Sequence, residues 1–335
     1  MKKSIYVAYT GGTIGMRPSE QGYIPAAGFL SQTVANMPEF HRAEMPHFTI
    51  HEYDSLIDSS DMNPSDWQQI ADDIHEHYEQ YDGFIILHGT DTMAYTASAL
   101  SFMFEDLGKP VIVTGSQIPL AELRSDGQVN LLNALYIAAN YPIAEVTLFF
   151  NNQLFRGNRS RKVDANGFNA FDSPNLPPLL KAGIKIEVNK QLVGIKTDKK
   201  MYVSPVKSQP IGVVTLYPGI SSEVVRNTLQ QPVKALILLS FGVGNAPKDQ
   251  ALLKQLAEAD AQDIIVLNCT QCVRGKVDMG GYANGHALRE VGVVSGTDMT
   301  PEAALAKLHY LLSQDLPVND IKRLLTENLR GELSI

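Results

Sequence analysis

The stretch Lys3-Ser-Ile-Tyr-Val-Ala-Tyr-Thr-Gly-Gly-Thr-Ile-Gly15 joins a short apolar run to a turn rich in glycine and threonine. The same order recurs in Gly83-Phe-Ile-Ile-Leu-His-Gly-Thr-Asp-Thr92. Such runs are typical of buried strands in a parallel sheet, where the loops after the carboxyl ends of the strands line the ligand crevice. We therefore expect Thr13, Thr90 and Asp91 to lie within reach of one another. They would supply a hydroxyl nucleophile beside a second hydroxyl and a carboxylate.

Apolar runs alternate with helix-like stretches along the chain, which is the pattern of βαβ units. Helices are expected where cap residues precede them, as at Asn63 before Pro64 and at Thr300 before Pro301. The predicted strands are residues 4–9, 83–87, 110–114, 145–150, 211–217, 234–240 and 263–267, and the predicted helices are residues 63–81, 92–107, 125–140, 221–229, 248–259 and two more after residue 300. The sequence therefore predicts an α/β protein with mainly parallel sheets.

The length of 335 residues exceeds what one hydrophobic core usually supports, so we expect two domains. The run from residue 183 to residue 209 is rich in lysine, alternates weakly and precedes a clear strand. It indicates an interdomain connection. The expected division is a larger catalytic domain at residues 1–185, a connection at residues 186–209 and a smaller α/β domain at residues 210–335.

Charge and composition exclude several classes of protein. A net charge of −8 argues against a nucleic-acid-binding surface. No stretch is apolar enough to cross a membrane, and the apolar run at residues 5–9 is too short for a secretory signal, so we expect a cytoplasmic protein. Cys269 and Cys272 form a C-x-x-C pair, interpreted either as a redox pair or, preferably, as two incidental thiols. The absence of further cysteines excludes a four-thiolate zinc site.

Glycines and polar residues follow five of the predicted strands. Glycine lets backbone N–H groups approach a ligand, and the polar side chains supply contacts to it. Neither G-x-G-x-x-G nor the P-loop pattern occurs, and no cation adjoins the first two loops, which argues against a nucleotide site. A lone threonine here would be read as a cap or turn hydroxyl, but five such loops together indicate one crevice. They are Thr10-Gly-Gly-Thr13, His88-Gly-Thr-Asp91, Thr114-Gly-Ser-Gln117, Asn151-Asn152 and Phe241-Gly-Val-Gly-Asn245.

Three further segments allow two interpretations each. The basic run Arg156-Gly-Asn-Arg-Ser-Arg-Lys162 is either a solvated loop or the source of one cation that pairs with Asp91, and the residues alone do not identify which. The cluster Asp58-Ser-Ser-Asp61 is either an acidic approach to a helix or a clamp in which Asp58 binds a substrate ammonium. The glycine-rich stretch around Tyr23 is either a surface loop or a mobile lid.

The motifs Tyr9-Thr-Gly-Gly-Thr-Ile-Gly15 and Leu87-His-Gly-Thr-Asp-Thr-Met-Ala-Tyr95 resemble the two signatures of bacterial-type L-asparaginases. The likeness is nearly end to end and is closest to the cytoplasmic, type I enzymes. Further similar stretches are Gly115-Ser-Gln-Ile-Pro119, Arg124-Ser-Asp-Gly127, Ala170-Phe-Asp-Ser-Pro-Asn175 and Gly242-Val-Gly-Asn-Ala-Pro247.

The resemblance implies hydrolysis of L-asparagine through a threonine acyl-enzyme, without a metal or an organic cofactor. It implies a flavodoxin-like amino-terminal domain, a smaller parallel carboxyl-terminal domain, and intimate dimers that often pair into tetramers. By motif, the nucleophile would be Thr13, and the companion triad would be Thr90, Asp91 and Lys162. Asp58 and Ser59 would bind the α-amino and α-carboxylate groups of the substrate. Tyr23 would lie on the closing loop, and Asn245 would come from the partner subunit.

One residue departs from the family pattern. Some type I enzymes bind asparagine at an effector site through an arginine in the strand before Gly242, and Leu239 occupies that position here. Leucine cannot bind a carboxylate, so allosteric activation by asparagine is not expected. The alternatives are a glutaminase-asparaginase, the related subunit that supplies ammonia for tRNA-linked amidation, and a non-catalytic amino-acid sensor. The second usually carries an extra amino-terminal domain, whereas strand one here begins almost at the first residue.

Overall fold

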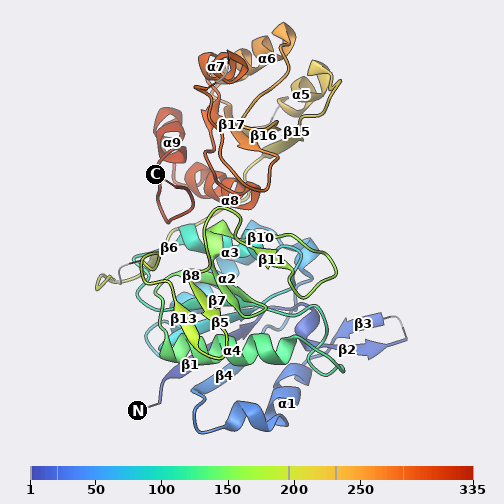
Figure 1. The fold of residues 1–335 in the computed structure, drawn as a ribbon, viewed down its shortest axis with the longest axis vertical. Coiled ribbons are helices and arrows are strands. Elements are labelled where there is room, and N and C mark those ends of the chain that lie inside the picture. Colours follow the sequence, from blue (N-terminus) through green and yellow to red (C-terminus); the bar gives the residue numbers. More distant parts are fainter. Residues whose placement is uncertain (1, 21, 195–196, 231, 282, 335) are drawn as a thin grey trace. The chain divides into compact units, whose positions relative to one another are not determined.

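A computed structural model describes residues 2–20, 22–194, 197–230, 232–281 and 283–334. The chain forms two compact units, Met1–Ser204 and Pro205–Ile335 (Figure 1). Among the residues that the structure describes, none of the helices combines the length and the apolar character needed to span a bilayer.

An eight-stranded sheet in the order β13-β12-β9-β8-β7-β5-β1-β4 is the core of the first unit. Counted along the chain, its five parallel strands follow the order 2-1-3-4-5, which is the flavodoxin-like arrangement and confirms that prediction. The parallel strands are β1 (Ser4–Tyr9), β4 (His47–Glu52), β5 (Gly83–Leu87), β7 (Val111–Thr114) and β8 (Val146–Phe150), and the antiparallel strands are β9 (Gln153–Arg156), β12 (Leu180–Ala182) and β13 (Ile186–Val188).

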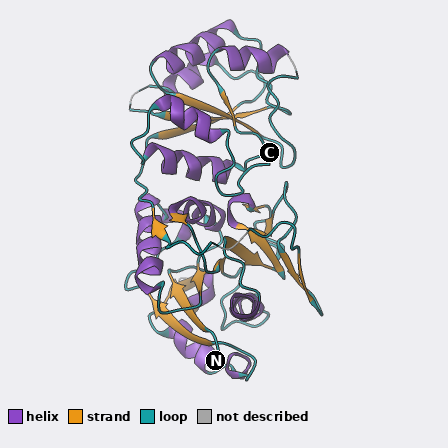
Figure 2. Ribbon diagram, turned by 90° about the vertical axis from the view of Figure 1, so that its left-hand side faces the viewer, coloured by secondary structure: helices purple, strands orange, loops and turns teal. Residues whose placement is uncertain are grey.

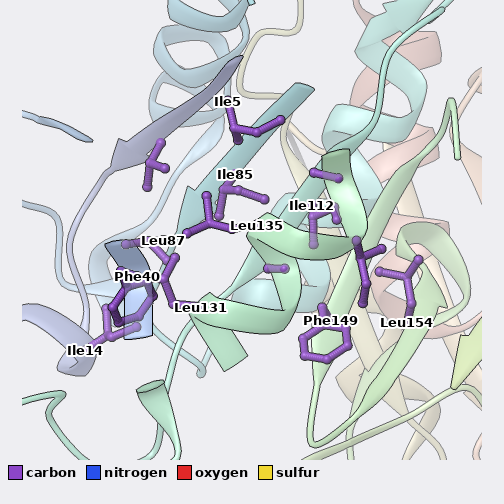
Figure 3. Packing of buried hydrophobic residues seen from close by; sticks show 14 of the residues in the cluster. Ile5, Ile14, Phe40, Ile85, Leu87, Ile112, Leu131, Leu135, Phe149 and Leu154 are labelled. Atoms are coloured by element: carbon purple, nitrogen blue, oxygen red, sulfur yellow. The ribbon is translucent and has the colours of Figure 1, made fainter. Parts of the chain in front are cut away.

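Helices cover both faces of this sheet (Figures 1 and 2). Helix α4 (Gly127–Asn140) packs on one face, where Figure 3 shows its Leu131 and Leu135 beside Ile85 and Leu87 of β5. Helices α2 (Pro64–His77) and α3 (Met93–Met103) pack on the other. There the hydroxyl of Tyr6 in β1 donates to Asp73 of α2 at 2.8 Å, and the indole of Trp67 in α2 donates to Thr96 of α3 at 3.1 Å. Burial on both faces explains why β1, β5, β7 and β8 are apolar runs.

Local sequence accounts for several element boundaries. Helix α2 begins at the predicted cap, where Asn63 and Asp66 form a reciprocal capping box and Pro64 takes the first helical position. Helix α3 ends at Met103, four residues before the predicted end, because β6 (Phe104–Glu105) pairs with β14 (Tyr202–Val203). Tertiary pairing has overridden helix propensity at that point.

The remaining elements of the first unit are short. A hairpin of β2 (Met16–Ser19) and β3 (Gly22–Pro25) occupies the stretch interpreted as a lid, and α1 (Phe29–Ala35) follows it. Strand β10 (Arg161–Lys162) pairs with β11 (Phe171–Asp172). The described residues of the expected interdomain connection include β13 and β14, which pair within the first unit. Four 3-10 turns complete it: η1 (Thr13–Gly15), η2 (Pro38–His41), η3 (Ser59–Asp61) and η4 (Gly157–Arg159).

The second unit is a four-stranded parallel sheet in the order β15-β16-β17-β18, with helices on both faces. Alternate residues of β16 face opposite ways: Leu238 packs in the cluster that includes Leu252 of α6, and Ile237 packs in the cluster that includes Leu308 of α8. This confirms the smaller parallel α/β domain. Its elements are β15 (Ile211–Thr215), α5 (Ser222–Thr228), β16 (Ala235–Ser240), α6 (Gln250–Ala261), β17 (Ile265–Thr270), α7 (Ala283–Glu290), β18 (Val294–Ser295), α8 (Pro301–Leu312) and α9 (Val318–Leu325).

Candidate active site

The loops after β1 and β5 touch each other at the point where the strand order reverses. Gly12 has a φ of 90°, and a Cβ atom on it would lie 2.4 Å from the backbone nitrogen of Gly89. A side chain therefore cannot be placed between the two loops, and glycine is required for both reasons. Thr13 and Thr90 each follow one of these two glycines, so the structure brings the two predicted hydroxyls into adjoining loops, as the strand pattern led us to expect.

A third loop, which carries Asp58 and Ser59, packs against the same place. A Cβ atom on Gly89 would lie 2.4 Å from Ser59 Oγ, and the hydroxyl of Thr92 donates to the carbonyl of Ser59 at 2.6 Å. Ser59 is buried here. Asp58 is exposed, and its carboxylate accepts hydrogen bonds from the backbone nitrogen and the hydroxyl of Ser60, both at 2.9 Å. This loop adds an acid and a hydroxyl to the crevice.

Lys162 links the second threonine to the neighbouring acid. Its Nζ atom lies 2.8 Å from Asp91 Oδ1 and donates to Thr90 Oγ1 at 2.9 Å. Arg156, from the same basic run, instead forms an ion pair with Glu145 at 2.6 Å. The geometry therefore places the cation implied by the family motif beside Thr90 and Asp91. The Lys162 side chain is 20% exposed and the Asp91 side chain 65% exposed, so the acid of the pair is open to solvent.

Gln117 is a member of this cluster for which no role was predicted from the sequence. The hydroxyl of Thr90 donates to Gln117 Oε1 at 3.0 Å. The amide nitrogen of Gln117 donates to the carbonyl oxygens of Gly167 at 3.1 Å and Ala165 at 3.3 Å. The signal that pointed to it was its place as the last residue of the polar run after β7.

The side chain of His88 supports the loop that follows β5. It is fully buried, with Nδ1 2.7 Å from the carbonyl oxygen of Gly89 and Nε2 2.8 Å from the hydroxyl of Thr96. A carbonyl oxygen can only accept, so Nδ1 carries the hydrogen and Nε2 accepts one from Thr96. Burial lowers the pKa of His88 to about 4, which keeps the imidazole neutral. Its hydrogen bond fixes the orientation of the peptide between Gly89 and Thr90.

Family models match both units of this chain. A model described as asparaginase, N-terminal, matches residues 4–194, and one described as glutaminase/asparaginase C-terminal domain matches residues 210–325. The chain belongs to the asparaginase family. This confirms the resemblance seen in the two threonine motifs.

Individual asparaginases are similar over the full length. The chain is 68% identical to L-asparaginase 1 of Escherichia coli (strain K12), with 99% of this chain and 98% of that protein covered. The crystal structure of L-asparaginase I from Vibrio cholerae O1 biovar eltor str. N16961 matches with a TM-score of 0.94 at 65% identity, covering 100% of both chains. The structure of the thermostable L-asparaginase from Thermococcus kodakarensis matches with a TM-score of 0.88 at 31% identity, covering 99% of both chains.

Two residues named from the asparaginase motifs belong to other segments of the chain. Tyr23 is in β3 of the hairpin and is 49% exposed. Asn245 is in the second unit, where a pair of backbone hydrogen bonds with Phe241 closes a turn. The buried amide of Asn268 donates to the carbonyl of Gly244 at 3.1 Å and supports that turn. The structure thus groups Thr13, Thr90, Asp91, Lys162, Asp58 and Ser59 in the first unit and places Tyr23 and Asn245 on separate segments.

The structure also describes the cysteines and Leu239, for which the sequence suggested other roles. Both cysteines are free; Cys269 is buried, which raises its pKa to about 12, while Cys272 is exposed. Leu239 is half-buried in β16, where its carbonyl accepts a hydrogen bond from Gln271 at 2.8 Å. Within the described residues, no group of three or more His, Cys, Asp and Glu side chains is arranged to hold a metal ion.

Proposed function

We propose that this asparaginase-family protein hydrolyses L-asparagine to L-aspartate and ammonia, with Thr13 as the nucleophile. The observation that carries the proposal is the contact of Lys162 with both Thr90 and Asp91. The loop of Thr90 and Asp91 in turn packs, through Gly89, on the loop that carries Thr13. The full-length similarity to proteins named L-asparaginase supports the choice of substrate. The reaction belongs to amino-acid catabolism, and the resemblance to type I enzymes supports a cytoplasmic location.

The proposed reaction is a double displacement. The hydroxyl oxygen of Thr13 attacks the side-chain amide carbon of asparagine, and the C–N bond breaks as ammonia leaves with the hydroxyl proton. Water then attacks the aspartyl ester, and its proton passes to the Thr13 oxygen when the ester C–O bond breaks. Thr90, Asp91 and Lys162 assist these proton movements as the companion triad.

The second loop offers backbone donors for the oxyanion of each tetrahedral intermediate. His88 binds the carbonyl of Gly89, so the N–H of Thr90 in the same trans peptide points the opposite way. We assign that N–H, with the N–H of Gly89, to the oxyanion. One such donor is worth roughly 2.7–4 kcal/mol of transition-state stabilisation.

Substrate binding is assigned to the neighbouring segments. Asp58 would pair with the α-ammonium group and Ser59 would donate to the α-carboxylate. Tyr23, on the exposed hairpin, would close over the bound substrate. Asn245 would enter from a second copy of the chain, which makes the intimate homodimer, arranged as a dimer of dimers, the active form.

The test is release of ammonia from asparagine and from glutamine over a concentration series. Thr13→Ala and Thr90→Val are each expected to lower kcat severely while the far-UV circular dichroism stays unchanged. Near-native turnover in both variants would refute the assignment, and no turnover by the unaltered enzyme would favour an amino-acid sensor. With Leu239 in place of an arginine, the velocity curve for asparagine is expected to be hyperbolic, and a sigmoidal curve would contradict that expectation.

A further inference from the structure

We propose that Gln117 is a positioning residue that holds the Thr90 hydroxyl proton, so that the Thr90 oxygen faces Lys162 and the attacking water only as a hydrogen-bond acceptor. The inference rests on the proposed asparaginase reaction and adds a residue to it. It follows from the direction of three hydrogen bonds that converge on the Gln117 amide.

The orientation of that amide is fixed by its surroundings. The carbonyl oxygens of Gly167 and Ala165 lie 3.1 Å and 3.3 Å from Nε2, and carbonyl oxygens can only accept. The nitrogen of Gln117 therefore faces them, and its oxygen Oε1 faces Thr90 at 3.0 Å. An amide oxygen also only accepts, so Thr90 has to be the donor in this contact.

This direction determines how the Thr90 hydroxyl uses its one hydrogen and the two lone pairs of its oxygen. The hydrogen is directed at Gln117, and one lone pair accepts the N–H of Lys162 at 2.9 Å. The second lone pair is left for the hydrolytic water. A water that donates there is oriented for attack on the aspartyl ester, while Thr90 keeps its own proton throughout. The transferred proton passes from the water to the Thr13 oxygen as the ester C–O bond breaks, so atoms and charge balance in this step.

Gln117 is itself held firmly in place. Both carboxylate oxygens of Asp126 accept from its backbone nitrogen at 3.0 Å, and Asp126 also accepts from the backbone nitrogen of Ile118 at 3.1 Å. Asn130 of α4 donates to the carbonyl of Gly115 at 3.0 Å, which ties the start of this loop to the helix. Preorganisation of this kind is what a positioning group requires, because a loosely held amide would not set the direction of a hydroxyl.

Gln117 also reaches the segment that follows Lys162. That segment is closed by the hydrogen bond from the backbone nitrogen of Val163 to the carbonyl of Ala170 at 2.8 Å. Within it, the carboxylate of Asp164 accepts from the backbone nitrogen of Gly167 at 2.9 Å. These two hydrogen bonds hold the turn in which the carbonyl of Gly167 accepts from Gln117. One amide therefore connects Thr90 to the loop of its lysine partner, and two groups of the companion triad share this support.

The test compares Gln117→Met and Gln117→Glu with the unaltered enzyme, and uses Gln80→Met, at an exposed glutamine after α2, as the matched control. Gln117→Met keeps the length of the side chain and removes its three hydrogen bonds. We expect kcat to fall about 10- to 100-fold with KM nearly unchanged, the range for leaving a partly buried polar group unpaired. Because the ester hydrolysis slows, the first turnover should release one equivalent of ammonia per site in a burst.

Gln117→Glu supplies a second measurement, the pH dependence of activity, which would not change if Gln117 had only a structural role. A protonated glutamic acid accepts from Thr90 and donates to the Gly167 carbonyl, as the amide does, whereas a carboxylate faces two carbonyl oxygens without a hydrogen to share. Activity of this variant should therefore recover as the pH falls, relative to the unaltered enzyme. Both variants are to show the circular dichroism of the native fold.

The outcomes separate the two proposals. If the unaltered enzyme releases no ammonia from asparagine, the proposed function fails. If it is active and Gln117→Met retains its kcat, the positioning role of Gln117 fails alone. The role is also overturned if Gln117→Met shows no burst and the pH profile of Gln117→Glu matches that of the unaltered enzyme. A loss of kcat with a burst, together with acid rescue of Gln117→Glu, supports it.

Discussion

Gly12 and Gly89 pack backbone against backbone, so that a Cβ atom on Gly12 would lie 2.4 Å from the nitrogen of Gly89. This contact joins the exits of β1 and β5, which are neighbours in the sheet. The connections from these two strands run to opposite faces, and ligands of such sheets bind at this reversal. The separation of Thr13 and Thr90 therefore depends on two glycines that have no side chain to contribute.

Gly12→Ala is expected to abolish most of the activity. The added methyl group cannot avoid the Gly89 backbone, and the φ of 90° is strained for alanine. A displacement of the loops by about 1 Å is enough to cost on the order of 100-fold in rate. The measurement is kcat for ammonia release. Gly219→Ala is the matched control, because Gly219 has a φ of 84° but open space around it, and it should lose some stability without losing turnover.

Lys162→Met is expected to reduce turnover far more than stability. The Asp91 side chain is 65% exposed, and an ion pair in such a position is typically worth no more than about 1 kcal/mol. Removal of a group that assists proton transfer costs about 10²- to 10⁴-fold in rate. Steady-state kinetics and urea unfolding measured on the same preparation test both statements. Lys199→Met, which breaks the exposed pair with Asp106 at 3.6 Å, should change neither quantity.

Elements with strong apolar character were predictable from the sequence, and those held by partners were not. Strands β1 and β5 have the predicted bounds because their residues are buried on both faces. Strand β4 was missed because His47–Glu52 lies at the sheet edge, where exposed and half-buried residues alternate. It was also obscured by its histidines and glutamate, which weaken a strand pattern.

The site shows the same division. Thr13, Thr90 and Asp91 each follow a predicted strand. Because parallel strands end at one edge of the sheet, the sequence predicted that these three residues would lie close together. Lys162 was identified only through the family resemblance, since 71 residues separate it from Asp91 and no periodicity relates them. The contact of Gln117 with Thr90 is likewise a long-range hydrogen bond whose direction depends on two carbonyl oxygens in another loop.

The stability of the protein is expected to fall as the pH drops from about 6.5 to about 4, in part because of His88. Burial holds the pKa of folded His88 near 4, below its ordinary value of 6.5. Above pH 6.5 the imidazole is neutral in both states and costs nothing. Between the two values only the unfolded chain binds the proton, so folding loses up to roughly 3 kcal/mol. His309, whose pKa is also lowered by burial, acts in the same direction.

The check is urea unfolding at a series of pH values for the unaltered protein and for His88→Gln. The variant cannot titrate at this position, so its stability should decline less over the same interval. Acidic groups titrate in both proteins and cancel in the comparison. Identical pH dependence in the two proteins would show that His88 is already protonated in the folded state at pH 6.

Glu332→Gln is expected to destabilise the second unit strongly. Lys307 and Glu332 are both fully buried, with Nζ and Oε1 2.6 Å apart, and burial lowers the pKa of Lys307 while Glu332 opposes that shift. Replacing the carboxylate by a neutral amide leaves a buried cation with uncharged partners only, among them the carbonyl oxygens of Leu325 and Glu327, which typically costs about 3–5 kcal/mol. Chemical denaturation of the whole chain measures this loss.

Two comparisons distinguish a buried-charge effect from the loss of any ion pair. Glu258→Gln breaks an exposed pair with Lys254 at 3.7 Å in the same unit and should change stability by less than about 1 kcal/mol. Lys307→Met combined with Glu332→Gln removes the stranded cation and should be more stable than Glu332→Gln alone. If the double variant is the less stable of the two, the hydrogen bonds of Lys307 to the carbonyl oxygens of Leu325 and Glu327 outweigh the cost of its unneutralised charge.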